Sequence, residues 1–472
     1  MSKLPVLKSA CGIFTAVAVT VAVAGLTLAC GALAAGANGS AGRASSAAAP
    51  VASMALANDT GLGGFEPLTP WRQPSVELPP PRLLAYQQLA EVGVSQASHW
   101  RHGAWYCEYL RCTHGPYPLV TIWGEVPLFE TADALEMASP SSAHQALVDR
   151  FARANERYWD GALGGYAPYP GDRAGNVQAF FDDNGWEGLA FFDAYKATHE
   201  RRWLFDAQRA FHFIAARGWD KDGGGMWWNT SHPYHSGPAL ASDSLLGILL
   251  YGEDHERWQL EDVKMYVDWA NANDNHDERQ FYLEMPNRPE SVNDYVQAPL
   301  VYAQYLLCQD GEGEGYCVQA GRVAATLAEQ HVDKYGYEYN YGPEYDAIFM
   351  QWMMAYGQAT GESYWLTLAE VNAAAAATNA GKGHGLWLSS WWGGPIADPE
   401  THPNMLRTMG ATTSLFAWVG VYSSAGGTVA HDASRRSSVL YGSTGRATPE
   451  GYGLKDALPL LGVETRRSVP VA

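Results

Sequence analysis

Apolar residues recur at helical spacing in segment after segment of this chain, and Gly, Pro and Asp separate the segments. Runs that alternate between apolar and polar residues, as strands do, are few. The pattern predicts an all-α core of about twelve helices. They are expected to begin near Leu84, Leu119, Ser142, Asp183, Arg202, Ala239, Leu260, Asn293, Tyr316, Tyr345, Ser363 and Thr408.

A weak internal repeat supports this number of helices. The order Ala-Tyr, Thr, Glu, Trp-Leu occurs at residues 194–204 and again at residues 355–366, with Glu200 and Glu362 in equivalent positions. Their separation of 162 positions is three times about 54, the length of one helical hairpin with its loops. No short consensus unit recurs, so a closed (α/α)6 barrel of six hairpins fits better than an open solenoid. Its loops would form a cleft at one end.

The N-terminal segment differs from this core. Lys3 and Lys8 precede an apolar run over residues 12–28, and a small-x-small pattern, Ala-Leu-Ala, ends at Ala34. These features predict a secretory signal peptide over residues 1–34. Lipid attachment at Cys30 and a retained signal anchor are the alternatives.

Composition divides the remainder of the chain. Residues 35–82 are rich in Ala, Gly, Ser and Pro, which predicts a low-complexity linker. The barrel domain is expected to occupy residues 83–424. Residues 425–472 turn polar again, and we expect a disordered tail.

Charge and aromatic content narrow the classes of partner. Acids outnumber bases 50 to 31, and the net charge of −19 argues against nucleic acid or an anionic membrane as the main partner. Beyond the signal segment no run of about 18 uncharged apolar residues predicts a membrane span. The 18 Trp and 26 Tyr are typical of proteins that hold neutral sugars by stacking and hydrogen bonds. A polysaccharide or oligosaccharide substrate and a monomeric protein are expected.

The cysteines suggest an oxidising compartment. Beyond the signal segment there are four, in two close pairs: Cys107 with Cys112, and Cys308 with Cys317. Two local disulfides are predicted, which agrees with a secreted, extracellular or cell-wall-associated protein. A metal site formed by the four thiolates is the alternative, but the pairs lack the short spacing of zinc knuckles.

Two adjacent carboxylates, Asp182 and Asp183, lie between aromatic residues just ahead of a predicted helix. In a poorly solvated cleft two neighbouring Asp side chains resist simultaneous ionisation, so one pKa rises and the pair can divide acid and nucleophile roles. The alternative is purely structural: an N-cap and a first-turn acid, both favourable against the helix dipole.

Placed on the helical frame, several motifs together resemble glycoside hydrolase family 76, the endo-α-1,6-mannanases and their fungal cell-wall relatives. The resemblance spans roughly residues 119–422. It rests on Phe180-Phe181-Asp182-Asp183-Asn184-Gly185-Trp186 with Leu189, Ala194 and Tyr195, on Gly218-Trp219-Asp220, on Gly223-Gly224-Gly225-Met226-Trp227-Trp228, on Asn293-Asp294-Tyr295-Val296-Gln297-Ala298, and on Leu406-Arg407-Thr408-Met409-Gly410-Ala411. The family usually carries a Lys-Asn-containing helix start after the two tryptophans, where this chain has residues 235–242.

The resemblance implies an (α/α)6 barrel that needs no cofactor or metal and hydrolyses glycosides with retention of configuration. Asp182 would be the nucleophile and Asp183 the general acid/base. Retaining enzymes hold their carboxyl groups about 5 to 5.5 Å apart, whereas neighbouring residues inside a regular helix diverge by roughly 100°. The pair is therefore expected at a helix terminus or an irregular turn.

Further residues of these motifs are candidates for binding sugar, each with a structural alternative. The candidates are Trp186, Trp227, Trp228, Tyr295, Gln297 and Arg407. At least one of the adjacent tryptophans is expected to face the cleft, although both could be core. Tyr295 and Gln297, at i and i+2, can both reach sugar only at a helix start. Arg407 would either pair with a cleft carboxylate or cap a neighbouring helix. His232 and His235 are a weaker candidate for a metal pair.

The predicted function is a secreted retaining glycosidase acting on α-1,6-linked mannan or a related α-linked polysaccharide. A cell-wall transglycosylase of the same family and a non-catalytic carbohydrate-binding descendant are the alternatives, and the presence of both aspartates disfavours the second. A prenyl-chain enzyme is excluded because Trp186 stands where a magnesium-binding Asp-Asp-x-x-Asp motif needs its third Asp.

Overall fold

The computed structural model describes residues 86–113, 119–171, 178–276, 281–286, 288, 292–330, 342–381, 386–396 and 404–423. The predicted signal peptide, linker and C-terminal tail lie outside these residues. The described chain contains twelve α-helices, and each begins within three residues of its predicted start. They are α1 (Tyr86–Gln96), α2 (Ile122–Ala138), α3 (Ser142–Asn155), α4 (Phe181–Thr198), α5 (Arg201–Arg217), α6 (Gly237–Asp254), α7 (Arg257–Trp269), α8 (Asp294–Gln309), α9 (Glu314–Gln330), α10 (Pro343–Thr360), α11 (Ser363–Asn379) and α12 (Leu406–Ser423).

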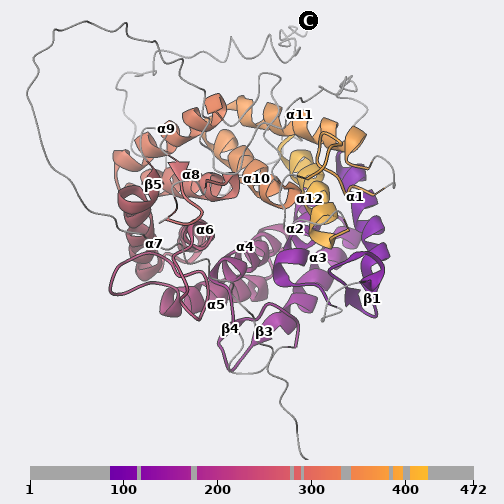
Figure 1. Ribbon diagram of the computed structural model, residues 1–472, viewed down its shortest axis with the longest axis horizontal. Coiled ribbons are helices and arrows are strands. Elements are labelled where there is room, and N and C mark those ends of the chain that lie inside the picture. Colours follow the sequence, from indigo (N-terminus) through magenta and orange to yellow (C-terminus); the bar gives the residue numbers. More distant parts are fainter. Residues whose placement is uncertain are drawn as a thin grey trace, which may run out of the picture. The chain divides into compact units, whose positions relative to one another are not determined.

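The helices form two concentric rings (Figure 1). The even-numbered helices make the inner ring, in which each contacts the next and α12 closes against α2. The odd-numbered helices lie outside them (Figure 1). The predicted (α/α)6 barrel is therefore confirmed. Three short antiparallel hairpins lie in the connecting segments: β1 (Arg101–His102) with β2 (Trp105–Tyr106), β3 (Trp159–Asp160) with β4 (Gly165–Tyr166), and β5 (Asn275–His276) with β6 (Phe281–Tyr282).

The two rings differ in sequence because they differ in burial. The inner helix α6 is buried continuously from Gly237 to Leu250, and its sequence is apolar on nearly every side. The outer helix α5 buries one stripe, in which Trp203, Ala207 and Phe211 recur at helical spacing. Each large side chain buried in this way contributes on the order of 1.5 to 3 kcal/mol.

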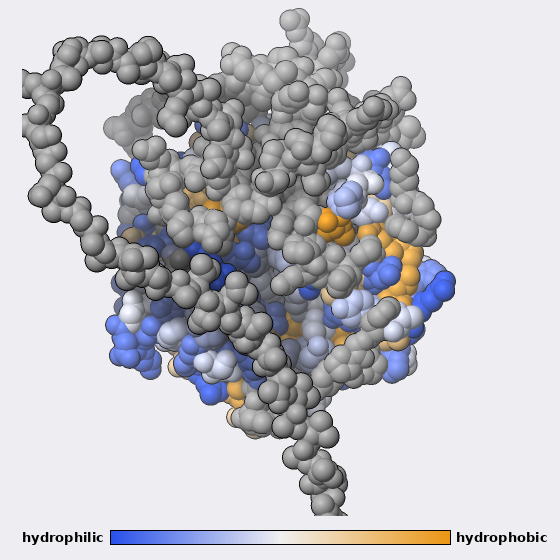
Figure 2. All heavy atoms as spheres, in the orientation of Figure 1, coloured by the Kyte–Doolittle hydropathy of each residue, from blue (hydrophilic) through white to orange (hydrophobic). Residues whose placement is uncertain are grey.

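The surface of the described residues carries few large apolar side chains. Only Val92, Phe205, Met265 and Val318 are exposed among them, one on each of four outer helices. Figure 2 shows hydrophilic residues along much of the described surface, with smaller apolar patches between them, most clearly on the right of the view. Singly scattered apolar residues of this kind are normal on a folded domain. In the part of the chain that the structure describes, no helix combines the length and the apolar character needed to cross a bilayer.

Both predicted disulfides are present. Cys107 pairs with Cys112, and Cys308 at the end of α8 pairs with Cys317 in α9. The first closes a short loop ahead of α2. The alternative of a four-thiolate metal site is thereby ruled out, because paired cysteines have no thiolate to offer.

Candidate functional site

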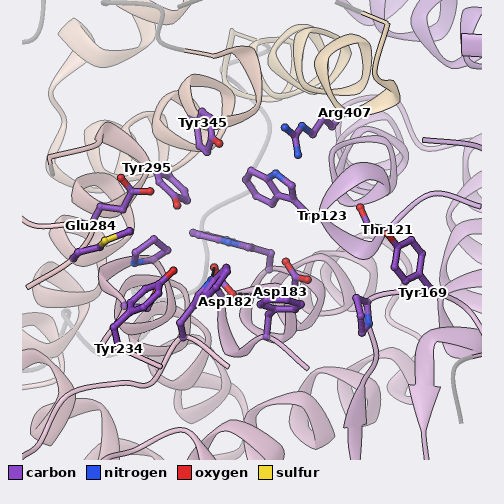
Figure 3. Close-up of a pocket in the computed structure, with 17 residues that line it drawn as sticks. Thr121, Trp123, Tyr169, Asp182, Asp183, Tyr234, Glu284, Tyr295, Tyr345 and Arg407 are labelled. Atoms are coloured by element: carbon purple, nitrogen blue, oxygen red, sulfur yellow. Dashed lines mark hydrogen bonds between the residues drawn. The ribbon is translucent and has the colours of Figure 1, made fainter. Parts of the chain in front are cut away.

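The described residues line an open cavity of about 510 Å³ at one end of the inner ring (Figure 3). Every inner helix contributes a residue from its first turns or from the segment just before it. The lining consists of Thr121, Trp123, Pro168, Tyr169, Phe180, Asp182, Asp183, Trp186, Trp228, Tyr234, Ser236, Pro238, Glu284, Met285, Tyr295, Tyr345 and Arg407. Because the inner helices all begin at this end, the positive ends of six helix dipoles lie near the cavity and favour negative charge there.

Asp182 and Asp183 lie in the first turn of α4, as the geometric requirement of a catalytic pair predicts. The preceding Phe180 is extended, with φ −100° and ψ 135°, and bridges to Asn229 in the loop that follows the three glycines. Asn184 secures the turn, because its side-chain amide donates to the carbonyl oxygens of Tyr166 and Phe180 at 3.0 and 2.7 Å. The pair therefore projects from a helix start that its neighbours hold in place.

Gly185 allows α4 to lie close to α6. A Cβ atom at this position would lie 2.2 Å from the Ser242 hydroxyl oxygen and 2.6 Å from a carboxyl oxygen of Asp243, far inside contact distance. The glycine of the Asp-Asp-Asn-Gly-Trp run is thus a packing requirement between two inner helices, and it keeps the acidic pair at its position over the cavity.

Asp182 accepts hydrogen bonds that favour its ionised form. Its two carboxyl oxygens accept from the backbone N–H of Asp183 at 3.0 Å and from the indole N–H of Trp228 at 3.2 Å. Burial raises the pKa of Asp182 to about 7, and these hydrogen bonds oppose the rise. Both hydrogen bonds are made to carboxyl oxygens and therefore support the ionised form of Asp182.

Asp183 has a different environment. Burial raises its pKa well above the usual range of an Asp, and the negative charges of Asp182 and Glu108 raise it further, while Arg407 lowers it. Two neighbouring carboxyl groups thus receive unequal support as anions. This asymmetry favours Asp183 as the proton carrier and Asp182 as the anion.

Arg407 pairs with a carboxylate of another inner helix. Its Nε atom lies 2.9 Å from a carboxyl oxygen of Glu344, and both side chains are largely buried between the starts of α12 and α10. Since Arg407 also lowers the pKa of Asp183, it combines a structural ion pair with an electrostatic effect on the acidic pair.

Aromatic rings from four inner helices surround the carboxyl groups (Figure 3). Trp186 and Tyr295, predicted to bind sugar, line the cavity but are only 1% and 6% exposed. Trp123 and Tyr345 are more accessible, and their ring centroids lie 5.7 Å apart. The ring of Tyr295 packs against Tyr345, with the centroids 4.9 Å apart. Trp186 and Tyr295 therefore support the rings of Trp123 and Tyr345, two accessible residues that the motifs did not indicate.

The adjacent tryptophans face different spaces. Trp228 lines the cavity and stacks on Tyr234, with ring centroids 5.0 Å apart and planes 17° apart. Trp227 contacts His232 and His235 and lines a separate depression of about 410 Å³. Successive residues of extended backbone point to opposite sides, so one of the pair has to leave the cavity.

Gln297 lies outside the cavity, contrary to the expectation that it contacts sugar. Its side chain is fully buried, donates to the carbonyl oxygens of Tyr282 and Asn293 at 2.7 and 2.9 Å, and accepts from the N–H of Tyr282 at 2.9 Å. Residues at i and i+2 of a helix do not share a face. With Tyr295 lining the cavity, Gln297 points away and fixes strand β6 instead.

The two histidines form no metal pair among the described residues. His235 lies with its Nε2 atom 3.0 Å from a carboxyl oxygen of Asp220, and His232 stacks on Trp227. In the described part of the chain, one cluster places three potential ligand atoms close together, His102 with Cys107 and Cys112. The disulfide between those cysteines removes their thiolates, so this cluster is no thiolate metal site.

Comparison with known proteins gives one family and one fold. The model of "Glycosyl hydrolase family 76" matches residues 152–245, the segment that contains the acidic pair and both tryptophans. A comparison of the sequence with curated proteins gives no match.

Solved structures share the fold over most of the described chain. A family 76 α-mannanase from Bacteroides thetaiotaomicron superposes with a TM-score of 0.64 at 20% identity, covering 72% of this chain and 96% of that one. An inactive variant of an α-1,6-mannanase from Salegentibacter sp. HEL1_6, with two consecutive aspartates changed to asparagine and α-1,6-mannotriose bound, gives a TM-score of 0.57 at 14% identity, covering 71% and 99%. A cellobiose 2-epimerase from Bacillus thermoamylovorans gives a TM-score of 0.52 at 12% identity, covering 70% and 98%.

The last of these structures shows that the barrel also carries a different reaction, so the fold by itself does not identify the chemistry. The family-model match is more specific, because it covers the acidic pair and the glycine-rich loop with its tryptophans. The resemblance of this chain to glycoside hydrolase family 76 is therefore confirmed, and the match supports glycoside hydrolase activity.

Proposed function

We propose that this protein is a secreted retaining glycoside hydrolase that cleaves α-1,6-linked mannan or a related α-linked polysaccharide. One observation carries the proposal: two adjacent carboxyl groups, unequally supported as anions, project into an aromatic-lined cavity from the start of α4. A neutral carbohydrate suits this cavity, because indole and phenol rings cover the apolar faces of sugars while carboxyl and hydroxyl groups bind their hydroxyls.

In the first step Asp183 acts as the general acid. Its carboxylic acid gives a proton to the glycosidic oxygen as the bond between that oxygen and the anomeric carbon breaks. A carboxylate oxygen of Asp182 forms a bond to the anomeric carbon, which gives a covalent glycosyl-enzyme ester. The hydrogen bond from Trp228 holds the attacking carboxylate in place.

In the second step Asp183, now a carboxylate, takes a proton from water. The water oxygen bonds to the anomeric carbon, and the ester bond to Asp182 breaks. Formation of the ester removes the charge of Asp182, which lowers the pKa of Asp183 and suits it to act as a base. Two displacements at the same carbon return the original configuration.

The choice of substrate rests on relatives and on the shape of the site. A structural neighbour is an α-1,6-mannanase that binds α-1,6-mannotriose in a variant lacking two consecutive aspartates. Trp123, Tyr345, Trp228 and Tyr234 offer accessible rings for sugar units in this chain, with Trp186, Tyr295 and Arg407 in support. We propose that these residues form the subsites and that the protein acts as a monomer.

The test measures release of oligosaccharides from a panel of α-linked mannans, including unbranched α-1,6-mannan, by chromatography. Wild type should release oligosaccharides, and Asp182→Asn and Asp183→Asn should each lower the rate of release by about 10³-fold or more while keeping the fold. Asp222→Asn, in the exposed loop after α5, is the matched control and should leave the rate unchanged.

Other outcomes favour the other candidates. Transfer to an added oligosaccharide acceptor without net hydrolysis would identify a transglycosylase, because the same ester then reacts with a sugar hydroxyl in place of water. Binding of mannan by wild type with neither release nor transfer would identify a carbohydrate-binding protein and overturn the proposal.

A further inference from the structure

We propose that Glu108 is a positioning residue for Asp183: its carboxylate, fixed at the start of α2, keeps the proton on Asp183 until the glycosidic bond breaks. The proposal rests on the function proposed above. Glu108 lies outside the segment that matches the family model, and it does not itself line the cavity.

The backbone of Glu108 is anchored on both sides. Its neighbour Cys107 is joined to Cys112, which closes a short loop. The carbonyl oxygen of Glu108 accepts from the N–H of Leu406 at 2.9 Å, and Tyr109 bridges to Met405. The disulfide loop is therefore fastened to the residues immediately before Arg407. Glu108 and Arg407, whose charges have opposite effects on the pKa of Asp183, thus come from two segments that are hydrogen-bonded to each other.

The side chain of Glu108 is held as firmly. One carboxyl oxygen accepts from both the N–H and the hydroxyl of Thr121, at 3.0 and 2.9 Å. The other is shielded from solvent and has no hydrogen-bond partner among the described protein atoms. Gly124 makes room for the carboxylate, because a Cβ atom there would lie 2.8 Å from each of its oxygens. Thr121 lines the cavity together with Asp183 (Figure 3), so the Glu108 carboxyl group, which is hydrogen-bonded to Thr121, lies directly behind the cavity wall.

Four charged or titratable groups influence or face Asp183. Asp182 on the same helix and Glu108 from the disulfide loop raise its pKa, and Arg407 from α12 lowers it. Glu187, one turn further along α4, is a buried acid whose own pKa is raised, in part by Asp183. When Asp182 becomes an ester its charge disappears, whereas Glu108 takes part in no bond change in either step. Glu108 therefore raises the pKa of Asp183 in both steps, whereas the contribution of Asp182 to this pKa is lost when the ester forms.

The test is the pH dependence of kcat/KM for α-1,6-mannan in Glu108→Gln. The amide oxygen of Gln can still accept from Thr121, so the variant removes the charge and retains the anchor. The basic limb of the profile, which reports deprotonation of the general acid, should move to lower pH, because the variant removes a negative charge that raises the pKa of Asp183. Well below the limb, kcat/KM should stay near that of wild type.

Two further variants keep the test decisive. Glu108→Asp retains the charge and should restore the basic limb toward its wild-type position. Glu136→Gln is the matched control: Glu136 is a largely buried acid at the other end of α2, where its carboxylate accepts from the N–H of Ser141 at 3.0 Å. Its loss should leave the profile unmoved.

A folded Glu108→Gln whose activity falls equally at every pH, or whose limb does not move, would overturn the proposal, since a merely structural residue behaves in that way. A limb that moves in Glu108→Gln and returns in Glu108→Asp supports it. Failure of the proposed function is a separate result, because wild type would then show no hydrolysis at any pH.

Discussion

Helix α4 carries acids in two settings, and the contrast shows how the carboxyl groups proposed to be catalytic differ from a merely buried one. Asp182 and Asp183 lie in the first turn and Asp193 lies about three turns further on, inside the barrel. Burial raises the pKa of all three. A raised pKa therefore does not by itself identify the site.

The difference lies in what surrounds each acid. The first-turn pair lines a cavity at which the inner helices begin. The indole of Trp228 donates to Asp182, and Arg407 lowers the pKa of Asp183. Asp193 is fully buried, and one of its oxygens accepts from the Gln351 side chain at 3.3 Å while the other has no partner among the described residues. The pair lines the cavity, whereas Asp193 does not.

The same contrast extends to α2. Asp133 is fully buried, neither of its carboxyl oxygens has a partner in the described part of the protein, and burial raises its pKa well above the usual range. Such acids are expected to be uncharged inside the folded barrel, because an unpaired buried charge costs far more than a retained proton.

The largest expected effect separates the two members of the proposed catalytic pair. Asp183→Asn should lower kcat/KM on α-1,6-mannan by about 10³-fold, because the leaving sugar loses its proton donor. An aryl glycoside with an acidic leaving group should recover most of the rate of bond cleavage in this variant, as it needs little protonation. Asp182→Asn should recover none of it. Equal recovery in both variants, measured by release of the phenol, would contradict the assignment of roles.

A smaller effect tests the interior acid. Burial raises the pKa of Asp193 to about 8, against about 4 in an unfolded chain. The folded protein then holds a proton that the unfolded chain releases, so this contribution to stability is full below about pH 4 and is lost as pH rises to about 8. Asp193→Asn does not titrate and should raise the Tm relative to wild type by a few degrees at pH 8, with little difference at pH 4.

Thermal unfolding followed by circular dichroism at both pH values checks this. A Tm difference that is the same at pH 4 and pH 8 would mean that Asp193 is ionised in the fold, and the contrast within α4 would fail. Asp222→Asn, which is exposed, serves as the control and should leave the Tm unchanged at both.

The smallest effect concerns the hydrogen bond from Trp228 to Asp182. Trp228→Phe keeps an aromatic ring and removes the N–H that favours the Asp182 carboxylate. The pKa of Asp182 should rise, and the acid limb of the kcat/KM profile should move to higher pH by up to about one unit. A limb that stays in place, with the fold intact, would show that the indole positions sugar and does not support the anion.

How far the sequence predicts the molecule depends on whether a feature is local. The helix starts follow from the spacing of apolar residues and from the Gly, Pro and Asp residues between them. The acidic pair is recognisable in a short run whose glycine allows α4 to pack against α6. Trp123 and Tyr345 could not be identified in this way, because only closure of the ring brings the starts of α2 and α10 together. Both residues lie at the starts of inner helices, and this shared position identifies them only once the arrangement of the ring is known.

Glu108 and Gln297 show the two ways in which local sequence can mislead: the motifs did not indicate Glu108, and they wrongly indicated Gln297 as a cavity residue. Glu108 lies in a loop with no helical periodicity, and its relation to Asp183 depends on contacts with Thr121 and Leu406. Gln297 stands in a recognisable motif, yet its helical phase turns it toward strand β6. Motif membership therefore located the neighbourhood of the site, and helix phase decided which members face the substrate.

The most direct test of the central claim is proton NMR of unbranched α-1,6-mannan during the first minutes of incubation with wild type. The account predicts that the newly formed reducing ends appear first as the α anomer and convert to β only by mutarotation, since two displacements at Asp182 retain configuration. Appearance of the β anomer first would mean a single inverting displacement and would contradict the assignment of Asp182 as nucleophile.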